Sequence, residues 1–142
     1  MEDPAGNGWS IATHLGKNYI PEGPNSISAG FVAKGAAQLI DFLKRAFDAQ
    51  EVQRWEWPGG FSASIRIGES VVGVSESTNH EWMRPMPSMI YMYVPDCDAL
   101  YAQALRAGAK SISPPADMPY GDRHGAVEDA WGNQWYIATP IK

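Results

Sequence analysis

The sequence predicts an α+β fold made of two copies of one βαβββ unit. Patterns in residues 27–76 follow the order strand, helix, strand, strand, strand, and the same order recurs in residues 89–140. Three positions of the first predicted helix recur in the second at an offset of 61: Leu39, Ile40 and Leu43 correspond to Leu100, Tyr101 and Ala104. A repeated order of elements with matching helices indicates an internal duplication.

The first unit begins with a predicted strand, ISAGFVA, over residues 27–33. The segment GAAQLIDFLKRAFDA, residues 35–49, predicts a helix because its apolar residues fall on one face. Three strands follow over residues 51–57, 61–67 and 71–76, joined by the turns PGG and GES. Residues 61–67 alternate between apolar and polar side chains, so one face of this sheet is predicted to be buried.

The second unit begins with a predicted strand over residues 89–94. Asp96 is the expected N-cap of the helix CDALYAQALRAG, and Gly108 is expected to end it. The next segment, KSISP, predicts an edge strand that stops at Pro114 and Pro115, since proline cannot donate a ladder hydrogen bond. The segments HGAVED and QWYIAT predict a hairpin around AWGN.

Composition excludes several classes of partner. The formal net charge is -5, with 44% hydrophobic and 19% charged residues. This balance indicates a globular protein and gives no clustered Lys and Arg surface for nucleic acid. No apolar run approaches the roughly 20 residues of a membrane span. The single Cys97 excludes an internal disulfide and fits a reducing compartment. We therefore expect a cytoplasmic protein with no nucleic-acid and no membrane partner.

Four segments resemble the vicinal-oxygen-chelate superfamily, which includes glyoxalase I, extradiol dioxygenases and bleomycin-resistance proteins. They are AAQLIDFLKRAFDAQE, IRIGESVVGVSES, VPDCDALYAQALRAGAK and PPADMPYGDRHGAVEDAWGNQWYIATP. Within this superfamily the sequence is most similar to the PhnB-like group, also labelled demethylubiquinone methyltransferase-like. No Gly-rich loop that opens a helix is present to hold a nucleotide-like methyl donor, so the methyltransferase label is not adopted.

The resemblance implies that two modules, about residues 27–78 and 87–142, curl their mixed sheet into a cup. The helices would lie outside this cup and a small-molecule ligand inside it, and the protein would form a homodimer. Residues 1–26 would then be an N-terminal arm and linker that precede the domain of residues 27–142.

The N-terminal arm repeats the end of the chain. EDPAGNGWSIATH, residues 2–14, matches EDAWGNQWYIATP, residues 128–140, at eight of thirteen positions. By the resemblance, this arm looks like the last hairpin of a preceding module of the same family. We hypothesise that the chain derives from a tandem array, and we expect residues 8–14 to form an extra strand.

Strand alternation assigns side chains either to the helices or to the cup. Apolar residues such as Ile65, Ile90 and Trp135 are assigned to the helix side. The predicted ligand-binding residues on the cup side are Ser28, Arg66, Gly73, Met89, Tyr91, His124, Glu128 and Tyr136.

The metal ligands of the superfamily correspond, by the resemblance, to Ser28, Gly73, Met89 and Tyr136. Divalent metals bind carboxylate oxygens or imidazole, which none of these four residues offers. We therefore expect no metal and no other cofactor. A relocated site using His124 and Glu128 would have side chains about 13 Å apart by strand rise, too far for one ion.

The function we predict is metal-independent binding of a small organic or aromatic molecule in the cup. One alternative is a glyoxalase-like lyase or isomerase, or a dioxygenase, with His124 and Glu128 as catalytic residues or with a relocated metal. Another is an inactive partner module of a tandem protein. The sequence leaves open whether the protein is an enzyme. Of the remaining candidates, Cys97 is expected to be a buried apolar residue, and Asp122 and Arg123 are expected to pair structurally.

Overall fold

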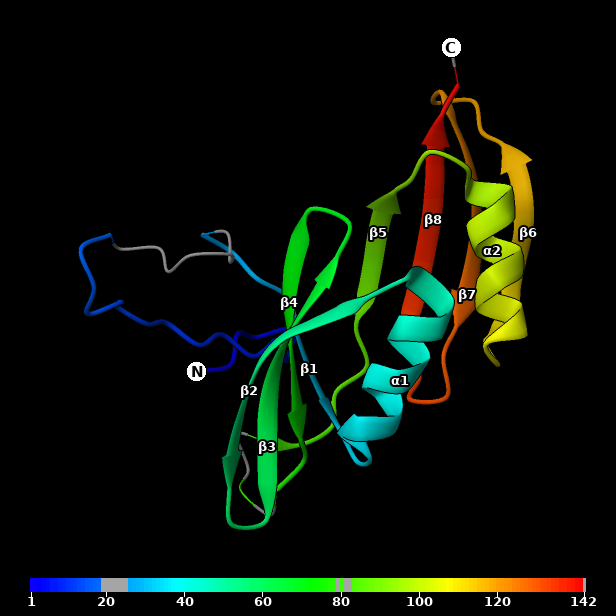
Figure 1. Ribbon diagram of the computed structural model, residues 1–142. Helices are drawn as coiled ribbons and strands as arrows, with labels where there is room; N and C mark the ends of the chain where they lie inside the picture. Colours follow the sequence, from blue (N-terminus) through cyan, green and yellow to red (C-terminus); the bar gives the residue numbers. More distant parts are fainter. Residues whose placement is uncertain (19–25, 79, 81–82, 142) are drawn as a thin grey trace.

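The computed structural model describes residues 1–18, 26–78, 80 and 83–141 (Figure 1). In chain order these residues form β1 (Gly30–Ala33), α1 (Ala36–Phe47), β2 (Gln50–Trp57), β3 (Gly60–Ile67), β4 (Ser70–Glu76), β5 (Met89–Tyr93), α2 (Cys97–Arg106), β6 (Lys110–Asp117), β7 (Asp122–Glu128) and β8 (Gln134–Pro140). This order confirms the predicted α+β fold and the duplication of a βαβββ unit.

The strands form two mixed four-stranded sheets, which stand side by side in Figure 1. Their orders are β1-β4-β3-β2 and β5-β8-β7-β6, so both units have the same topology. The first strand of each unit pairs in parallel with the last, and the other pairs are antiparallel. The sheets form an open cup, and α2 lies along β6 and β7 on its outer side.

The helices begin and end at residues suited to those positions. The side chain of Asp96 accepts a hydrogen bond from the backbone N–H of Ala99 at 3.0 Å, as predicted for an N-cap. Gly108 follows α2 with a φ of 108°, a left-handed conformation that favours glycine. No helix in the described ranges is long and apolar enough to cross a membrane.

One hydrophobic core joins the two units. Trp135 of β8 is only 1% exposed and packs against two phenylalanines of the first unit. Its ring centroid lies 5.4 Å from that of Phe31 and 4.7 Å from that of Phe47. The helices also meet, since Arg45 Nη1 donates to the carbonyl of Ala107 at 3.0 Å. Because Trp135, the largest fully buried side chain, packs against residues of the other unit, the two units share one core.

The prediction that a strand would stop at Pro114 is wrong, because β6 continues through both prolines to Asp117. β6 is an edge strand, so the missing proline N–H groups can lie on its unpaired side. The pairing with β7 is irregular between Ser113 and Ala116, where the prolines lie. Edge position and local irregularity together explain why the strand tolerates them.

The expected extra strand over residues 8–14 is also wrong. Residues 9–15 form neither helix nor strand, and only an isolated bridge joins Glu2 to Gly8. The first 18 residues extend away from the side of the molecule that holds the helices (Figure 1). Glu2 pairs with Arg84, which ties the arm to the loop before β5. A strand needs a neighbour to accept its hydrogen bonds, and among the described residues no backbone hydrogen bond is found for residues 10–15.

The turn of the N-terminal arm nevertheless has the same side-chain hydrogen bonds as the turn between β7 and β8. In both turns one carboxylate oxygen, of Asp3 or Asp129, accepts the backbone N–H groups two and four residues later, all at 2.9 Å. The other oxygen accepts the indole N–H of Trp9 or Trp135 at 3.0 Å. The glycine three residues after each aspartate has a φ of 84° or 83°. The repeated residues therefore determine the shape of the turn, whereas a following strand forms only where a neighbouring strand can pair with it.

Candidate functional site

The register of the strands shows which of the predicted ligand-binding residues share the face of the sheet opposite the helices. Residues paired directly across a sheet share one face. In the second sheet Tyr91 pairs with Tyr136, and His124 pairs with Ala138. In the first sheet Arg66 pairs with Val71. The intervening residues lie in the core, including Ile65, Trp135 and Ile137.

Three of the predicted site residues lie together on the concave face of β5, β8 and β7. The rings of Tyr91 and Tyr136 are 6.3 Å apart and nearly parallel, with an interplanar angle of 9°. The imidazole of His124 lies 6.0 Å from the first ring and 5.9 Å from the second. Tyr120, which the prediction missed, stacks at 6.2 Å from the same imidazole. Tyr93 adjoins Tyr91 at 5.4 Å. We call these five residues the aromatic cluster.

Asp122 joins this cluster through two hydroxyl groups. The hydroxyl of Tyr91 donates to Asp122 Oδ2 at 2.8 Å, and that of Tyr93 donates to the same oxygen at 3.2 Å. Burial raises the pKa of Tyr91 well above its usual value, and the bond to Asp122 raises it further. The negative charge of Asp122 is the main reason why the pKa of Tyr93 is also raised. Both phenols therefore remain protonated hydrogen-bond donors at neutral pH.

His124 has an unsatisfied nitrogen inside the cluster. Its side chain is 8% exposed, and Nδ1 is buried without a hydrogen-bond partner among the described residues. A buried polar atom without a partner costs about 1–3 kcal/mol, and folded proteins leave few of them. The atom lies among the rings of Tyr91, Tyr120 and Tyr136. Because the atom is buried, a ligand could supply the missing hydrogen bond only by inserting between these rings.

The other predicted site residues lie apart from the cluster. Arg66 and Gly73 belong to the first sheet, and Ser28 is an exposed residue just before β1. Met89 begins β5 and is exposed at the end away from Tyr93. Glu128 ends β7, four residues from His124, which by strand rise separates the two side chains by about 13 Å.

The donor set of the cup does not suit a divalent metal. Within the described ranges, no three His, Cys, Asp or Glu side chains gather in a way that could hold an ion. The four residues predicted from the sequence to stand at metal-ligand positions, Ser28, Gly73, Met89 and Tyr136, supply a hydroxyl, a bare backbone, a thioether and a phenol. Divalent metals favour carboxylate or imidazole ligands, so these residues do not fit such a centre.

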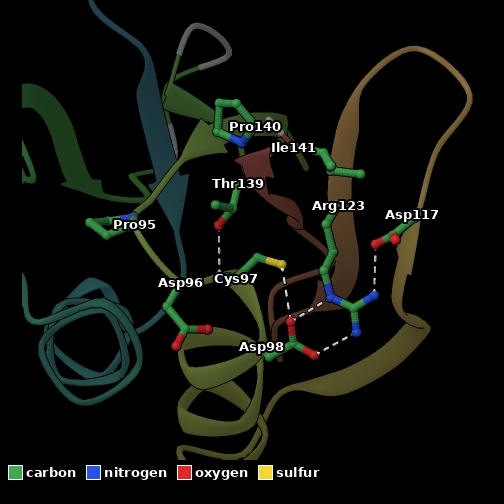
Figure 2. A pocket seen from close by; sticks show the side chains of 9 residues that line it. All are labelled: Pro95, Asp96, Cys97, Asp98, Asp117, Arg123, Thr139, Pro140 and Ile141. Atoms are coloured by element: carbon green, nitrogen blue, oxygen red, sulfur yellow. Dashed lines mark hydrogen bonds and ion pairs between the residues drawn. The ribbon is translucent and has the colours of Figure 1, made fainter.

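A hollow of about 350 Å³ lies on another part of the molecule, at the start of α2 (Figure 2). Arg123 crosses it and donates to Asp98 at 2.7 and 2.8 Å and to Asp117 at 2.9 Å. Cys97 is buried there, and its burial raises the pKa of the thiol. Its backbone N–H donates to Thr139 Oγ1 at 2.8 Å. These groups satisfy one another, so the hollow is a structural feature, and Cys97 is buried as expected.

The prediction that Asp122 pairs with Arg123 is wrong. Consecutive residues of a strand point to opposite faces, so Arg123 turns to the outer side and Asp122 to the cup. The alternation that had placed His124 in the cup also applies to Asp122, two residues earlier. Tyr120 precedes β7, where no strand pattern could have placed it.

Comparison with known proteins identifies the family. The family model of the Glyoxalase/Bleomycin resistance protein/Dioxygenase superfamily matches residues 27–137. An uncharacterized protein from Mycobacterium bovis is 34% identical over 128 residues, covering 82% of this chain and 84% of the relative. An uncharacterized protein from Mycobacterium tuberculosis is also 34% identical over 128 residues, which cover 82% of this chain and 75% of that relative.

Solved structures share the fold. TioX from Micromonospora sp. ML1 aligns with a TM-score of 0.66 and 21% identity, over 81% of this chain and 96% of that one. A glyoxalase/bleomycin resistance protein/dioxygenase family enzyme from Burkholderia phytofirmans PsJN aligns with a TM-score of 0.68 and 18% identity, over 80% and 97%. The narrower likeness to the PhnB-like group stays a prediction. The match over residues 27–137 and the paired βαβββ units show that the chain belongs to the Glyoxalase/Bleomycin resistance protein/Dioxygenase superfamily.

Proposed function

We propose that this protein binds a small organic molecule with a flat apolar body, without a metal, on the concave face of β5, β8 and β7. The observation that supports this most is the buried, unpartnered Nδ1 of His124 among the tyrosines of the aromatic cluster. The ligand would stack on the rings and complete the hydrogen bonding of the imidazole.

The aromatic rings supply the attraction. Tyr91 and Tyr136 stand parallel and offer ring faces and edges to a flat molecule. An aromatic contact contributes about 0.5–1.5 kcal/mol beyond the area it buries. Several such contacts, together with one restored hydrogen bond, are enough for micromolar binding if the site is preformed. The hydrogen bonds to Asp122 hold two of the rings in place before a ligand arrives.

The surroundings of His124 favour binding over general-base catalysis. A catalytic histidine is usually oriented by a carboxylate on one nitrogen while the other nitrogen exchanges the proton. Nδ1 of His124 has no such partner, and Glu128 lies at the far end of the same strand. Among the described residues, the imidazole packs against three tyrosine rings, which suits a recognition role.

The proposal is tested by calorimetric titration in EDTA with three probes that share one ring system: 2-naphthylmethylamine, 2-naphthalenemethanol and 2-naphthoate. At least one should bind with a dissociation constant in the micromolar range. Tyr136→Leu should weaken that binding tenfold or more, because it removes a ring from the cluster. Tyr101→Leu, a matched change on α2 outside the cup, should leave binding unchanged. Binding that requires an added divalent metal, or that survives Tyr136→Leu, would contradict the proposal.

A further inference from the structure

The geometry points to a ligand that bears a cationic group, such as an amine or an ammonium, seated against Asp122 within the tyrosines of the cluster. This inference rests on the proposed function and specifies the chemical class of its ligand. It follows from the carboxylate of Asp122, from the two tyrosines that donate hydrogen bonds to it, and from the lack of an ion-pair partner for it among the described residues.

Asp122 has no positively charged partner in the part of the chain that the structure describes. The neighbouring Arg123 points to the outer side, where Asp98 and Asp117 occupy its guanidinium (Figure 2). None of the other ion pairs found within the described ranges includes Asp122. Both tyrosine hydroxyls donate to Oδ2, and no hydrogen bond from a described residue is found for Oδ1. The carboxylate therefore has one oxygen that a ligand could use.

The rings around this carboxylate suit a cation. Tyr93 and Tyr120 are each 65% exposed, and Tyr91 lies between Tyr93 and His124, so their rings are accessible from the cup. The face of an aromatic ring is negative, and a cation within about 6 Å of its centroid is attracted by about 0.5–2 kcal/mol. Because the tyrosine protons are directed to Asp122, the hydroxyl oxygens present lone pairs to their surroundings. Rings, hydroxyl oxygens and carboxylate all favour the same sign of charge.

An anionic ligand would be disfavoured on this face. It would meet the carboxylate of Asp122 and the negative faces of the rings, while the neighbouring Arg123 is paired with Asp98 and Asp117 on the outer side. A neutral ligand could use the rings and donate a hydrogen bond to the carboxylate, but it would gain no attraction between opposite charges. The net charge of -5 also raises the local concentration of cations at the surface. Of anionic, neutral and cationic ligands, a cationic ligand therefore has the most favourable interactions with the rings and the carboxylate.

The same three naphthyl probes test the inference, since they share one ring system and carry a positive, a neutral or a negative side group of similar size. We expect 2-naphthylmethylamine to bind at least tenfold tighter than 2-naphthalenemethanol, and 2-naphthoate to bind most weakly. Asp122→Asn should remove the preference for the amine, so that the amine and the alcohol bind this variant with dissociation constants within threefold of each other. Glu69→Gln removes one negative charge from the exposed β3–β4 turn of the other sheet and should leave the preference intact. Raising the salt concentration should weaken the amine more than the alcohol.

The outcomes separate this inference from the proposed function. If the alcohol binds as tightly as the amine, or if Asp122→Asn retains the preference, the inference is overturned while the binding site stands. If none of the probes binds, both are overturned. Circular dichroism of Asp122→Asn establishes that the variant is folded, and comparing the two probes on the same variant cancels any change in the rings that affects both.

Discussion

Asp3 and Asp129 occupy the same position in two copies of one turn, and each accepts the indole N–H of the tryptophan six residues later at 3.0 Å. The surroundings of the two copies differ completely. Trp135 lies in the core, whereas Trp9 is 52% exposed. The turn therefore forms from its own aspartate, glycine, asparagine and tryptophan, and burial is not what shapes it.

This difference predicts unequal effects of the same substitution. Asp129→Ala should lower the free energy of unfolding by about 2–4 kcal/mol, because it leaves buried donors of the turn and the Trp135 indole unsatisfied. Asp3→Ala should leave it nearly unchanged, because water can replace the lost bonds at this exposed turn. Urea unfolding of the two variants measures both values. Equal losses would show that the arm contributes to the stability of the domain.

The hydrogen bonds of the Asp3 carboxylate predict that the turn of the N-terminal arm opens at low pH. Hydrogen bonds from Asn7, followed by that from Trp9, lower the pKa of Asp3 from 3.8 to about 2. The lowered pKa means that the turn is favoured above pH 3.8 and loses this contribution as the pH falls through 2. The indole N–H resonance of Trp9, followed by NMR, should keep its shift at pH 4 and move only near pH 2. A midpoint at or above pH 4 would contradict the carboxylate network.

The shared core predicts cooperative unfolding of the two units. Trp135→Ala should cost about 3–5 kcal/mol, since it empties the space between Phe31 and Phe47. The matched change Trp9→Ala should cost little, because this side chain packs in no core. Thermal unfolding of the natural protein should show a single transition by both calorimetry and near-UV circular dichroism. Two separate transitions would mean that the units fold independently.

The environment of Cys97 predicts an unreactive thiol. Burial raises its pKa, so little thiolate is present at pH 8 in the folded protein. Reaction with Ellman's reagent should be at least a hundredfold slower than in denaturant. A Ser28→Cys, Cys97→Ser double variant, which moves the thiol to an exposed position before β1, should react rapidly when folded. Rapid labelling of the natural protein would show that α2 opens at its start.

The expected homodimer remains to be tested in solution. The family resemblance implies it, and Val52, Trp55 and Trp57 of the edge strand β2 expose apolar surface that a second copy could cover. Light scattering at micromolar concentration should give twice the chain mass, and a Trp55→Glu variant should give the mass of one chain. A monomer in both cases would contradict the expectation.

Periodicity was sufficient to predict most of the fold. The apolar face of α1, the cap at Asp96 and the alternation of residues 61–67 are local signals, and the structure follows them. The strand predicted for residues 8–14 failed because a strand also depends on what lies beside it. The predicted end of β6 at its prolines was wrong for a related reason. The free-energy cost of a proline in a strand depends on whether that strand lies at the edge of the sheet.

The candidate site was only partly predictable. Alternation placed Tyr91, His124 and Tyr136 on one face, but it could not show that β5, β8 and β7 bring them within about 6 Å. The role of Asp122 depends on tyrosines some 30 positions earlier in the chain, which meet it only through the order of the sheet. The unpaired Nδ1 of His124 is a property of three-dimensional packing and leaves no mark in the sequence.

The central claim, metal-free recognition at the aromatic cluster, is tested most directly by NMR of histidine nitrogens. Protein labelled with ¹⁵N-histidine is titrated in EDTA with whichever naphthyl probe binds most tightly. We predict that Nδ1 of His124 shifts saturably with the calorimetric dissociation constant, while the nitrogens of the exposed His14 do not move. A His124 signal that stays fixed at saturation, or that responds only after a divalent metal is added, would contradict the account.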